Sequence, residues 1–175
     1  MRWLALTFAF VLAGCVSPVV VDHRSGTDFT AYQSYTIVAP GNDRESLSLD
    51  SQRVEQALTR VLADRPMTAT ADNADVAIRY RFVPVEKFQG SSFRFGFGWF
   101  GNGYGVGTST PVEGETYNEY KLQVAVVDQA DKQVVWEATS RDTLYDSLDS
   151  ERRVTRINTM VEEMFKRYPP GASAN

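Results

Sequence analysis

The only cysteine in the chain is Cys15, and it stands directly after an apolar N-terminal segment. This segment has one charged side chain, Arg2, then a largely apolar stretch at residues 3–11 and two small residues, Ala13 and Gly14. A charge, an apolar core and a small-residue site in that order are typical of a cleaved export signal. Because a single cysteine cannot form a disulfide within the chain, the rest of the protein must be stabilised by a hydrophobic core.

The sequence Leu12-Ala13-Gly14-Cys15 resembles the processing site of a bacterial lipoprotein signal peptide. The resemblance implies that residues 1–14 are removed, that the Cys15 thiol receives a diacylglyceryl group, and that the new amine is acylated, for example with palmitate. The alternatives are an ordinary secretory signal or a short membrane anchor, but an anchor needs roughly 20 apolar residues to span a bilayer. A lipid with three acyl chains would hold the protein permanently in a membrane, because two or more chains bind stably.

Residues 15–18 are expected to form a lipidated tether between the membrane and the folded domain. Residue 16 is Val rather than Asp. In the sorting pattern of enterobacterial lipoproteins, this favours the outer membrane over the inner membrane. We therefore expect the domain to be anchored to the outer membrane and to face the periplasm.

The net charge of the chain is −4 at pH 7, and removal of Arg2 would make the mature protein one unit more negative. Nucleic acids and anionic lipids are bound by clustered Lys and Arg side chains that neutralise phosphates. The acidic balance therefore excludes nucleic acid as an expected partner. The expected partners are the membrane, through the N-terminal lipid, and an envelope protein or a glycan such as peptidoglycan.

Apolar periodicity predicts both strands and helices in residues 19–170. The predicted strands, which alternate in polarity or contain β-branched runs, are residues 19–21, 35–38, 75–83, 120–126 and 134–140. A first amphipathic helix is predicted at residues 50–64, with Ser48 or Asp50 as its N-cap. A second amphipathic helix is predicted from an apolar stripe made of Val154, Ile157, Met160, Val161, Met164 and Phe165.

These elements predict an α+β fold in which residues 19–170 form a single two-layer domain. We expect a mainly antiparallel sheet with two amphipathic helices on one face and a long Gly/aromatic loop. Strands 120–126 and 134–140 are expected to pair as a hairpin, with Trp136 in the core beneath one or both helices. Residues 171–175 are small and polar, so a flexible tail is expected there.

Glycines and aromatic rings concentrate in residues 90–110, which we call the Gly/aromatic segment. The rings that form the candidate ligand or partner surface are Phe93, Phe95, Phe97, Trp99, Phe100 and Tyr104. Flat rings with glycines between them would suit the stacking of glycan rings, whereas Trp and Tyr also favour the membrane interface. A third alternative is a long loop whose rings partly cover the sheet.

The spacing of Gly96, Gly98 and Gly101 formally matches a dinucleotide-binding fingerprint. That motif must open a helix after a strand, and no helix-forming residues follow here, so a nucleotide cofactor is not expected. The Gly/aromatic segment is expected to leave the sheet at the end opposite Val19. In that arrangement it would face the periplasm rather than the membrane.

The sequence predicts neither a catalytic constellation nor a metal site. The only histidine, His23, lies near the expected tether and is interpreted as a solvated tether residue. One histidine and an acylated cysteine are too few ligands for zinc. The acidic residues are scattered, and neighbouring helical residues such as Glu162 and Glu163 point apart, which indicates a solvated face. The scattered acidic residues also include Glu113 and Glu115. The alternative is an envelope hydrolase that uses scattered carboxylates near the Gly/aromatic segment.

Several short motifs in a fixed order resemble a known bacterial lipoprotein family, number 4136 of the domains of unknown function. The motifs are Leu12-Ala13-Gly14-Cys15, Val21-Asp22, Asp28-Phe29-Thr30-Ala31-Tyr32-Gln33-Ser34-Tyr35, Leu49-Asp50-Ser51-Gln52-Arg53, Ala74-Asp75-Val76, Val134-Val135-Trp136-Glu137-Ala138 and Tyr168-Pro169-Pro170. One departure is Asp64-Arg65-Pro66-Met67, where the family pattern has a Gly-aromatic ending. The resemblance implies an exported α+β domain on the cell envelope and no established catalytic residues. We therefore expect a non-enzymatic binding or structural role.

Overall fold

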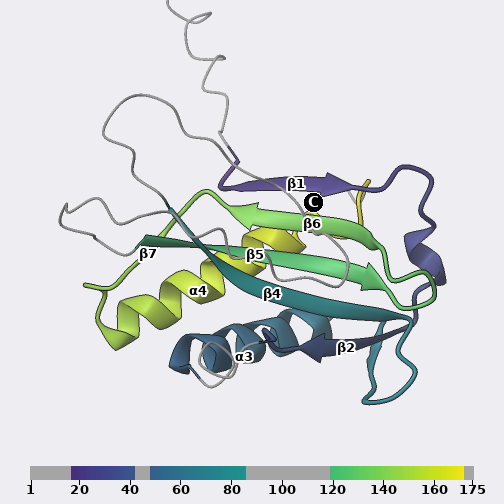
Figure 1. The fold of residues 1–175 in the computed structure, drawn as a ribbon, viewed down its shortest axis with the longest axis horizontal. Coiled ribbons are helices and arrows are strands. Elements are labelled where there is room, and N and C mark those ends of the chain that lie inside the picture. The colour runs from purple at the N-terminus through teal and green to yellow at the C-terminus, as the bar shows by residue number, and fades with distance from the viewer. Residues whose placement is uncertain (1–16, 42–47, 86–118, 172–175) are drawn as a thin grey trace, which may run out of the picture.

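The computed structural model describes residues 17–41, 48–85 and 119–171, which build one sheet and two helices beside it (Figure 1). The strands are β1 (Val19–His23), β2 (Ser34–Val38), β3 (Thr68–Ala69), β4 (Val76–Pro84), β5 (Glu119–Asp128), β6 (Val134–Ser140) and β7 (Leu144–Tyr145). The helices are α3 (Leu49–Ala63), α4 (Ser150–Phe165) and the short 3-10 turn η1 (Phe29–Ala31). The strand order is β1-β6-β5-β4-β2-β3, with β7 added beside β5.

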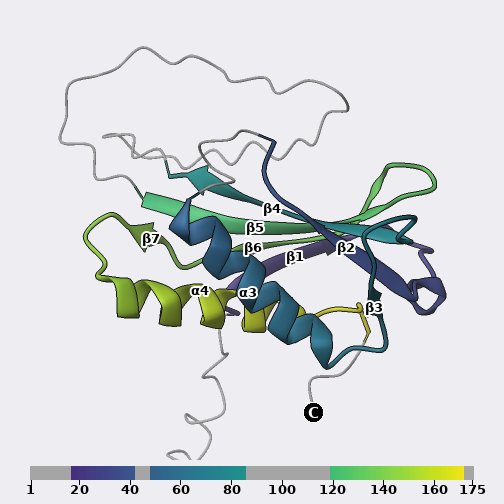
Figure 2. The ribbon, with the colours of Figure 1, turned by 90° about the horizontal axis from the view of Figure 1, so that it is seen from below.

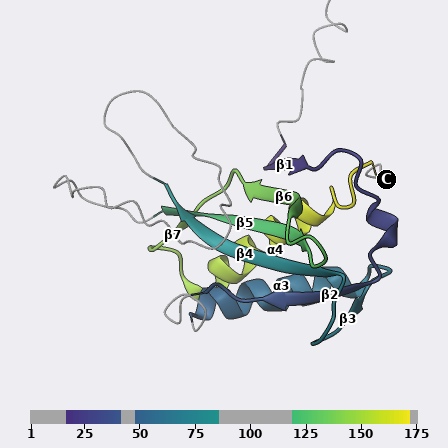
Figure 3. The same cartoon turned by 45° about the vertical axis from the view of Figure 1, so that its right-hand side comes forward.

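The centre of the sheet is the antiparallel set β4, β5 and β6, as the alternating sequence predicted. β4 pairs with β5 from Val76 opposite Asp128 to Pro84 opposite Tyr120. β6 returns beside β5 through a polar turn, and β1 pairs antiparallel with β6 at the edge. Figure 3 shows β1 and β3 at the two opposite edges. The predicted mixed fold with a mainly antiparallel sheet is confirmed.

One pair of strands runs differently from the rest, because β2 is parallel to β4. Parallel neighbours cannot be joined by a tight turn and need a crossover connection. Helix α3 provides that crossover, since it lies between β2 and β4 in the chain. The sequence prediction placed the helix correctly but did not state that it makes the strands around it parallel.

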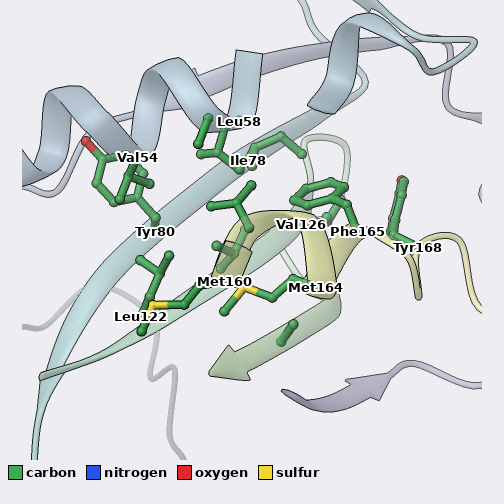
Figure 4. Packing of buried hydrophobic residues seen from close by; sticks show 14 of the residues in the cluster. Val54, Leu58, Ile78, Tyr80, Leu122, Val126, Met160, Met164, Phe165 and Tyr168 are labelled. Atoms are coloured by element: carbon green, nitrogen blue, oxygen red, sulfur yellow. The ribbon is translucent and has the colours of Figure 1, made fainter. Parts of the chain in front are cut away.

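Both helices cover the same face of the sheet, as predicted (Figure 2). Ser48 caps α3 by accepting a hydrogen bond from the Ser51 backbone, and Asp149 caps α4 in the same way from Arg152. Between the helices and the sheet lies the core shown in Figure 4. It combines Val54 and Leu58 of α3, Met160 and Met164 of α4, and sheet residues Ile78, Tyr80, Leu122 and Val126.

Trp136 lies at the centre of an aromatic cluster in this core, and its side chain is fully buried. Its ring centroid is 5.6 Å from that of Phe165 and 5.3 Å from that of Tyr168. Phe29 packs edge-on against Tyr168 at 5.7 Å, so the cluster joins η1 to the end of α4. The prediction that Trp136 is a core residue beneath a helix is confirmed.

The predicted apolar stripe of α4 was wrong at one position. Val154 is 39% exposed, whereas Ile157 and the later members of the stripe are buried. The first turns of α4 are held by Arg153, which forms an ion pair with Asp50 at 2.7 Å and donates a hydrogen bond to the Tyr145 carbonyl. Polar contacts there take the place of the apolar packing that periodicity alone suggested.

Candidate functional site

The residues proposed for function from the sequence lie mostly outside the described part of the chain. Cys15 and the candidate surface residues in the Gly/aromatic segment belong to the ranges 1–16 and 86–118. The residues that flank the second range are described: the Val85 N–H donates a hydrogen bond to the Glu119 carbonyl at 2.8 Å. The segment therefore leaves and re-enters the sheet at one place, between the end of β4 and the start of β5.

That place lies at the same end of the sheet as the start of β1, which contradicts the expectation from the sequence. Val19 pairs with Ser140, the last residue of β6. The same end of β6 lies beside the start of β5, since Thr139 pairs with Gln123. Figure 1 shows the end of β4 and the starts of β5 and β1 on the same side of the sheet. The prediction that the chain leaves the sheet for the Gly/aromatic segment at the end opposite Val19 was therefore wrong. The physical reason is that β1 pairs antiparallel with β6, a choice of partner and direction that the sequence pattern does not specify.

The interpretation of His23 as a tether residue was also wrong. His23 is the last residue of β1 and pairs with Trp136, so it belongs to the sheet. It is exposed, and its ring centroid lies 6.5 Å from that of Phe29. β1 carries it to the end of the domain opposite Val19.

At this opposite end, three connections surround an open pocket of about 640 Å³. They are the turn η1 with the start of β2, the loop between β3 and β4, and the turn between β5 and β6. The lining residues are Ala31, Tyr32, Thr36, Ala71, Asn73, Ala74, Asp75, Asp128, Gln129, Ala130 and Lys132. We call this site the distal pocket. The pocket was not predicted from the sequence, although the Asp residues in these connections were a signal for turns there.

Asp75 holds one wall of the distal pocket in place. Its Oδ2 accepts hydrogen bonds from the Ser34 hydroxyl at 2.8 Å and from the backbone N–H groups of Gln33 and Ser34, both at 2.9 Å. In return, the Asp75 N–H donates to the Ser34 hydroxyl oxygen at 3.0 Å. These donors favour the charged carboxylate and lower the pKa of Asp75, the Ser34 side chain most strongly. The pair joins the start of β2 to the start of β4.

Tyr32 and Asp128 form the second wall of the pocket. The Tyr32 hydroxyl donates to Asp128 Oδ2 at 2.8 Å, and the Ala130 N–H donates to Asp128 Oδ1 at 2.7 Å. Burial, together with the Asp128 carboxylate, raises the pKa of Tyr32 to about 12. The phenol therefore stays protonated at neutral pH and acts as a donor, not as a base.

The turn between β5 and β6 is fixed by a further set of polar contacts. Arg24 Nη1 forms an ion pair with Asp131 Oδ2 at 2.7 Å, and the Gln133 N–H donates to Asp131 Oδ1 at 2.9 Å. Lys132 adopts a positive φ of 60° in this turn, and its Nζ donates to Gln129 Oε1 at 2.8 Å. The turn thus has a defined shape at the rim of the distal pocket.

The carboxylates of Asp75, Asp128 and Asp131 each accept hydrogen bonds from donors of the protein itself. Among the described residues, no group of three or more His, Cys, Asp or Glu side chains could hold a metal ion. Glu162 contacts Arg60 of α3 at 3.5 Å, whereas Glu163 forms an ion pair with Lys166 on its own helix. These two side chains point apart, as predicted, while Glu113 and Glu115 lie outside the described residues.

Asp75→Asn is expected to lower the free energy of unfolding at neutral pH. It should also make the free energy of unfolding change less as the pH falls. A carboxylate whose folded pKa lies below its unfolded value of about 3.9 stabilises the fold above that value. Its contribution is lost as the pH falls through the folded pKa, so the difference from wild type should shrink in that range. Urea unfolding between pH 7 and pH 3 measures this, with Asp72→Asn in the same loop as the control. A stability difference that stays constant with pH would contradict the assignment.

The described helices include none with the length and apolar character needed to cross a membrane. Among solved structures, the chain resembles a PDZ domain protein from Parabacteroides distasonis, with a TM-score of 0.57 and 17% identity. That match covers 91% of this chain but spans only 37% of the other chain's length, and it shows similarity of fold alone.

Two weaker structural similarities have TM-scores below 0.5. One is the PelC dodecamer from Paraburkholderia phytofirmans, with a TM-score of 0.44, 12% identity, and coverage of 84% of this chain and 94% of that chain. The other is a minor lipoprotein from Acinetobacter baumannii, with a TM-score of 0.36, 10% identity, and coverage of 78% and 92%. A search of curated proteins finds no match.

The comparison with protein families is decisive for the classification of the chain. Residues 19–170 match the family described as Domain of unknown function (DUF4136). The match covers the whole sheet and both helices, and it agrees with the order of short motifs in the sequence. The chain therefore belongs to the DUF4136 family.

Proposed function

We propose that the protein is an envelope lipoprotein, anchored to the outer membrane through a lipid on Cys15, with a non-enzymatic binding or structural role in the periplasm. The observation that carries this proposal is the position of the cysteine relative to the fold. Ser17 already makes hydrogen bonds to Val19, the first residue of β1, so the folded domain starts two residues after Cys15. A processing site placed there would leave a complete domain attached directly to the lipid.

Two surfaces are available for a partner in this proposal. The first is the aromatic set from Phe93 to Tyr104, whose rings suit a glycan, a protein or the membrane interface. The second is the distal pocket, whose walls are fixed by Asp75 and by the Tyr32–Asp128 hydrogen bond. The engagement of these carboxylates within the fold supports binding over acid–base catalysis.

The binding role is tested with purified mature protein and isolated peptidoglycan sacculi. We expect the protein to sediment with the sacculi, and Phe93, Phe95, Phe97 and Trp99 changed together to Ser to abolish this. Ala130→Arg, which places a bulky charge in the distal pocket, is the matched variant for the second surface. Thermal unfolding checks that each variant is folded.

Photo-crosslinking from positions 95 and 130 in intact cells tests whether a protein partner binds at either surface. Absence of both sacculus binding and a specific crosslink would contradict the binding role. Release of soluble fragments from the sacculi by wild-type protein would instead support the envelope hydrolase, which needs two carboxyl groups facing each other across a cleft.

A further inference from the structure

Almost no free chain separates Cys15 from the sheet. The Ser17 hydroxyl donates to the Val19 carbonyl at 2.8 Å and accepts from the Val19 N–H at 3.2 Å. The Arg141 N–H donates to the Pro18 carbonyl at 2.9 Å. Residues 17 and 18 are therefore already part of the fold, which leaves Val16 as the only residue between Cys15 and the fold. Two residue steps span at most about 7 Å, so a lipid on Cys15 would hold the start of β1 close to the membrane.

The same end of the domain carries exposed apolar side chains. In the described part of the chain, the exposed large apolar residues are Val20 (45%), Leu49 (66%), Tyr145 (36%) and Val154 (39%). Val20 faces the side of the sheet that carries no helices, because Val19 before it is buried in the core, whereas Leu49 and Val154 belong to the helices.

The contacts of the fold bring these four residues to the end where β1 starts. Val20 is the second residue of β1, and Tyr145 in β7 pairs with Glu119 at the start of β5. Arg153, next to Val154, contacts both the Tyr145 carbonyl and Asp50, the neighbour of Leu49. The starts of α3 and α4 therefore lie beside β7 at this end (Figure 1).

Tyr145 has the surroundings of an interfacial residue. Its ring is partly exposed, and the Arg156 guanidinium lies over it at 5.6 Å from the centroid. Tyr is enriched where membranes meet water, and Arg can keep its charge in water while its stem contacts apolar groups. An aromatic ring with a cation above it suits the headgroup layer of a bilayer.

The opposite end of the domain holds the distal pocket and a group of acidic side chains. The turns and loops at this end hold two cationic side chains, Arg24 and Lys132. They also hold the carboxylates of Asp28, Asp72, Asp75, Asp128 and Asp131. The sheet separates the two ends, since the ten residues of β5 span about 33 Å. The distal pocket opens among these acidic groups, at that distance from the end where β1 starts.

We propose that the end of the domain formed by Val20, Leu49, Tyr145 and Val154 rests on the surface of the membrane that holds the lipid. The distal pocket then points away from that membrane, into the periplasm. This inference rests on the proposed lipid at Cys15. It assigns the membrane contact to the folded domain itself and leaves the pocket free for a partner.

The orientation is tested with the full lipidated protein in vesicles of phosphatidylethanolamine and phosphatidylglycerol. Acylation would occupy the only native cysteine, so Asp146→Cys and Ala130→Cys each introduce one unique site for a fluorescent label. Asp146 adjoins Tyr145 at the proposed contact, and Ala130 lies at the distal pocket. Lipids with a nitroxide on the headgroup should strongly quench the label at position 146 and leave the label at position 130 unquenched.

The outcomes separate this inference from the function on which it rests. Protein that does not float with the vesicles would overturn the lipid anchor. Protein that floats but shows equal quenching at positions 146 and 130, or more at 130, would overturn the orientation alone.

Two variants of the labelled protein identify the cause of the orientation. A flexible Gly-Ser insertion between Val16 and Ser17 should keep the protein on the vesicles but reduce quenching at position 146. Leu49→Ser combined with Val154→Ser should also reduce it, because the apolar contact is lost while the tether stays short. Unchanged quenching in both variants would contradict the proposed contact surface.

Discussion

Trp136→Ala is expected to lower the free energy of unfolding by about 3–5 kcal/mol, the usual cost of truncating a large buried aromatic side chain. The indole is fully buried and contacts both Phe165 and Tyr168, so the change leaves a cavity between β6 and the end of α4. Equilibrium unfolding in urea, measured in the unlipidated Cys15→Ser background, gives this value directly.

Two further variants serve as controls for the effect of Trp136→Ala on stability. Trp136→Phe should cost less than Trp136→Ala, because it keeps an aromatic ring and removes the indole N–H, which is buried without an acceptor among the described residues. Val154→Ala changes an exposed apolar residue of α4 and should shift stability by less than about 0.5 kcal/mol. A Trp136→Ala protein as stable as wild type would contradict the packing of the core.

Cys15→Ser is expected to remove the protein from the membrane fraction. The thiol is the only site in the chain for a thioether-linked lipid, and each buried methylene of an acyl chain contributes about 0.8 kcal/mol to membrane binding. Loss of the acyl chains therefore abolishes stable anchoring. Fractionation of cells, followed by detection of the protein in soluble and membrane fractions, measures the change.

A second variant controls for Cys15→Ser protein that stays in the membrane because its signal segment is not cleaved. Residues 1–15 are replaced by an ordinary cleavable secretory signal, and the resulting protein is expected in the soluble periplasmic fraction. Membrane association of this variant at the wild-type level would show that the lipid is not the anchor.

The sequence was sufficient to predict the central sheet and both helices because their burial is periodic. On β4, Ile78 and Tyr80 face the core while Arg79 and Arg81 face the other way, and this alternation was visible in the chain. Trp136 was predicted correctly as a core residue for the same reason. Where periodicity fails, as at Val154, the cause is a local polar contact made by Arg153.

Features that depend on distant parts of the chain were not predicted. The parallel pairing of β2 with β4 follows from the path of α3, and the two-residue strand β7 is too short to have a pattern. At the departure from the family motif, Arg65 donates hydrogen bonds to the carbonyls of Phe165 and Tyr168. That side chain ties the end of α3 to the end of α4, a contact across the chain that composition cannot show.

The candidate site was predicted only in part. The position of Cys15 before the first strand was clear, but the antiparallel pairing of β1 with β6 decides which end of the sheet lies next to Cys15. The distal pocket combines three connections that are far apart in sequence, and their shape depends on hydrogen bonds such as that from Tyr32 to Asp128. These partners become visible only when the sheet is assembled.

The most direct test of the account is the intact mass of the mature protein extracted from membranes. The account predicts a chain that begins at Cys15, with a diacylglyceryl group on the thiol and an acyl chain on the amine. A mature chain that begins at any other residue, or a Cys15 with an unmodified thiol, would contradict it.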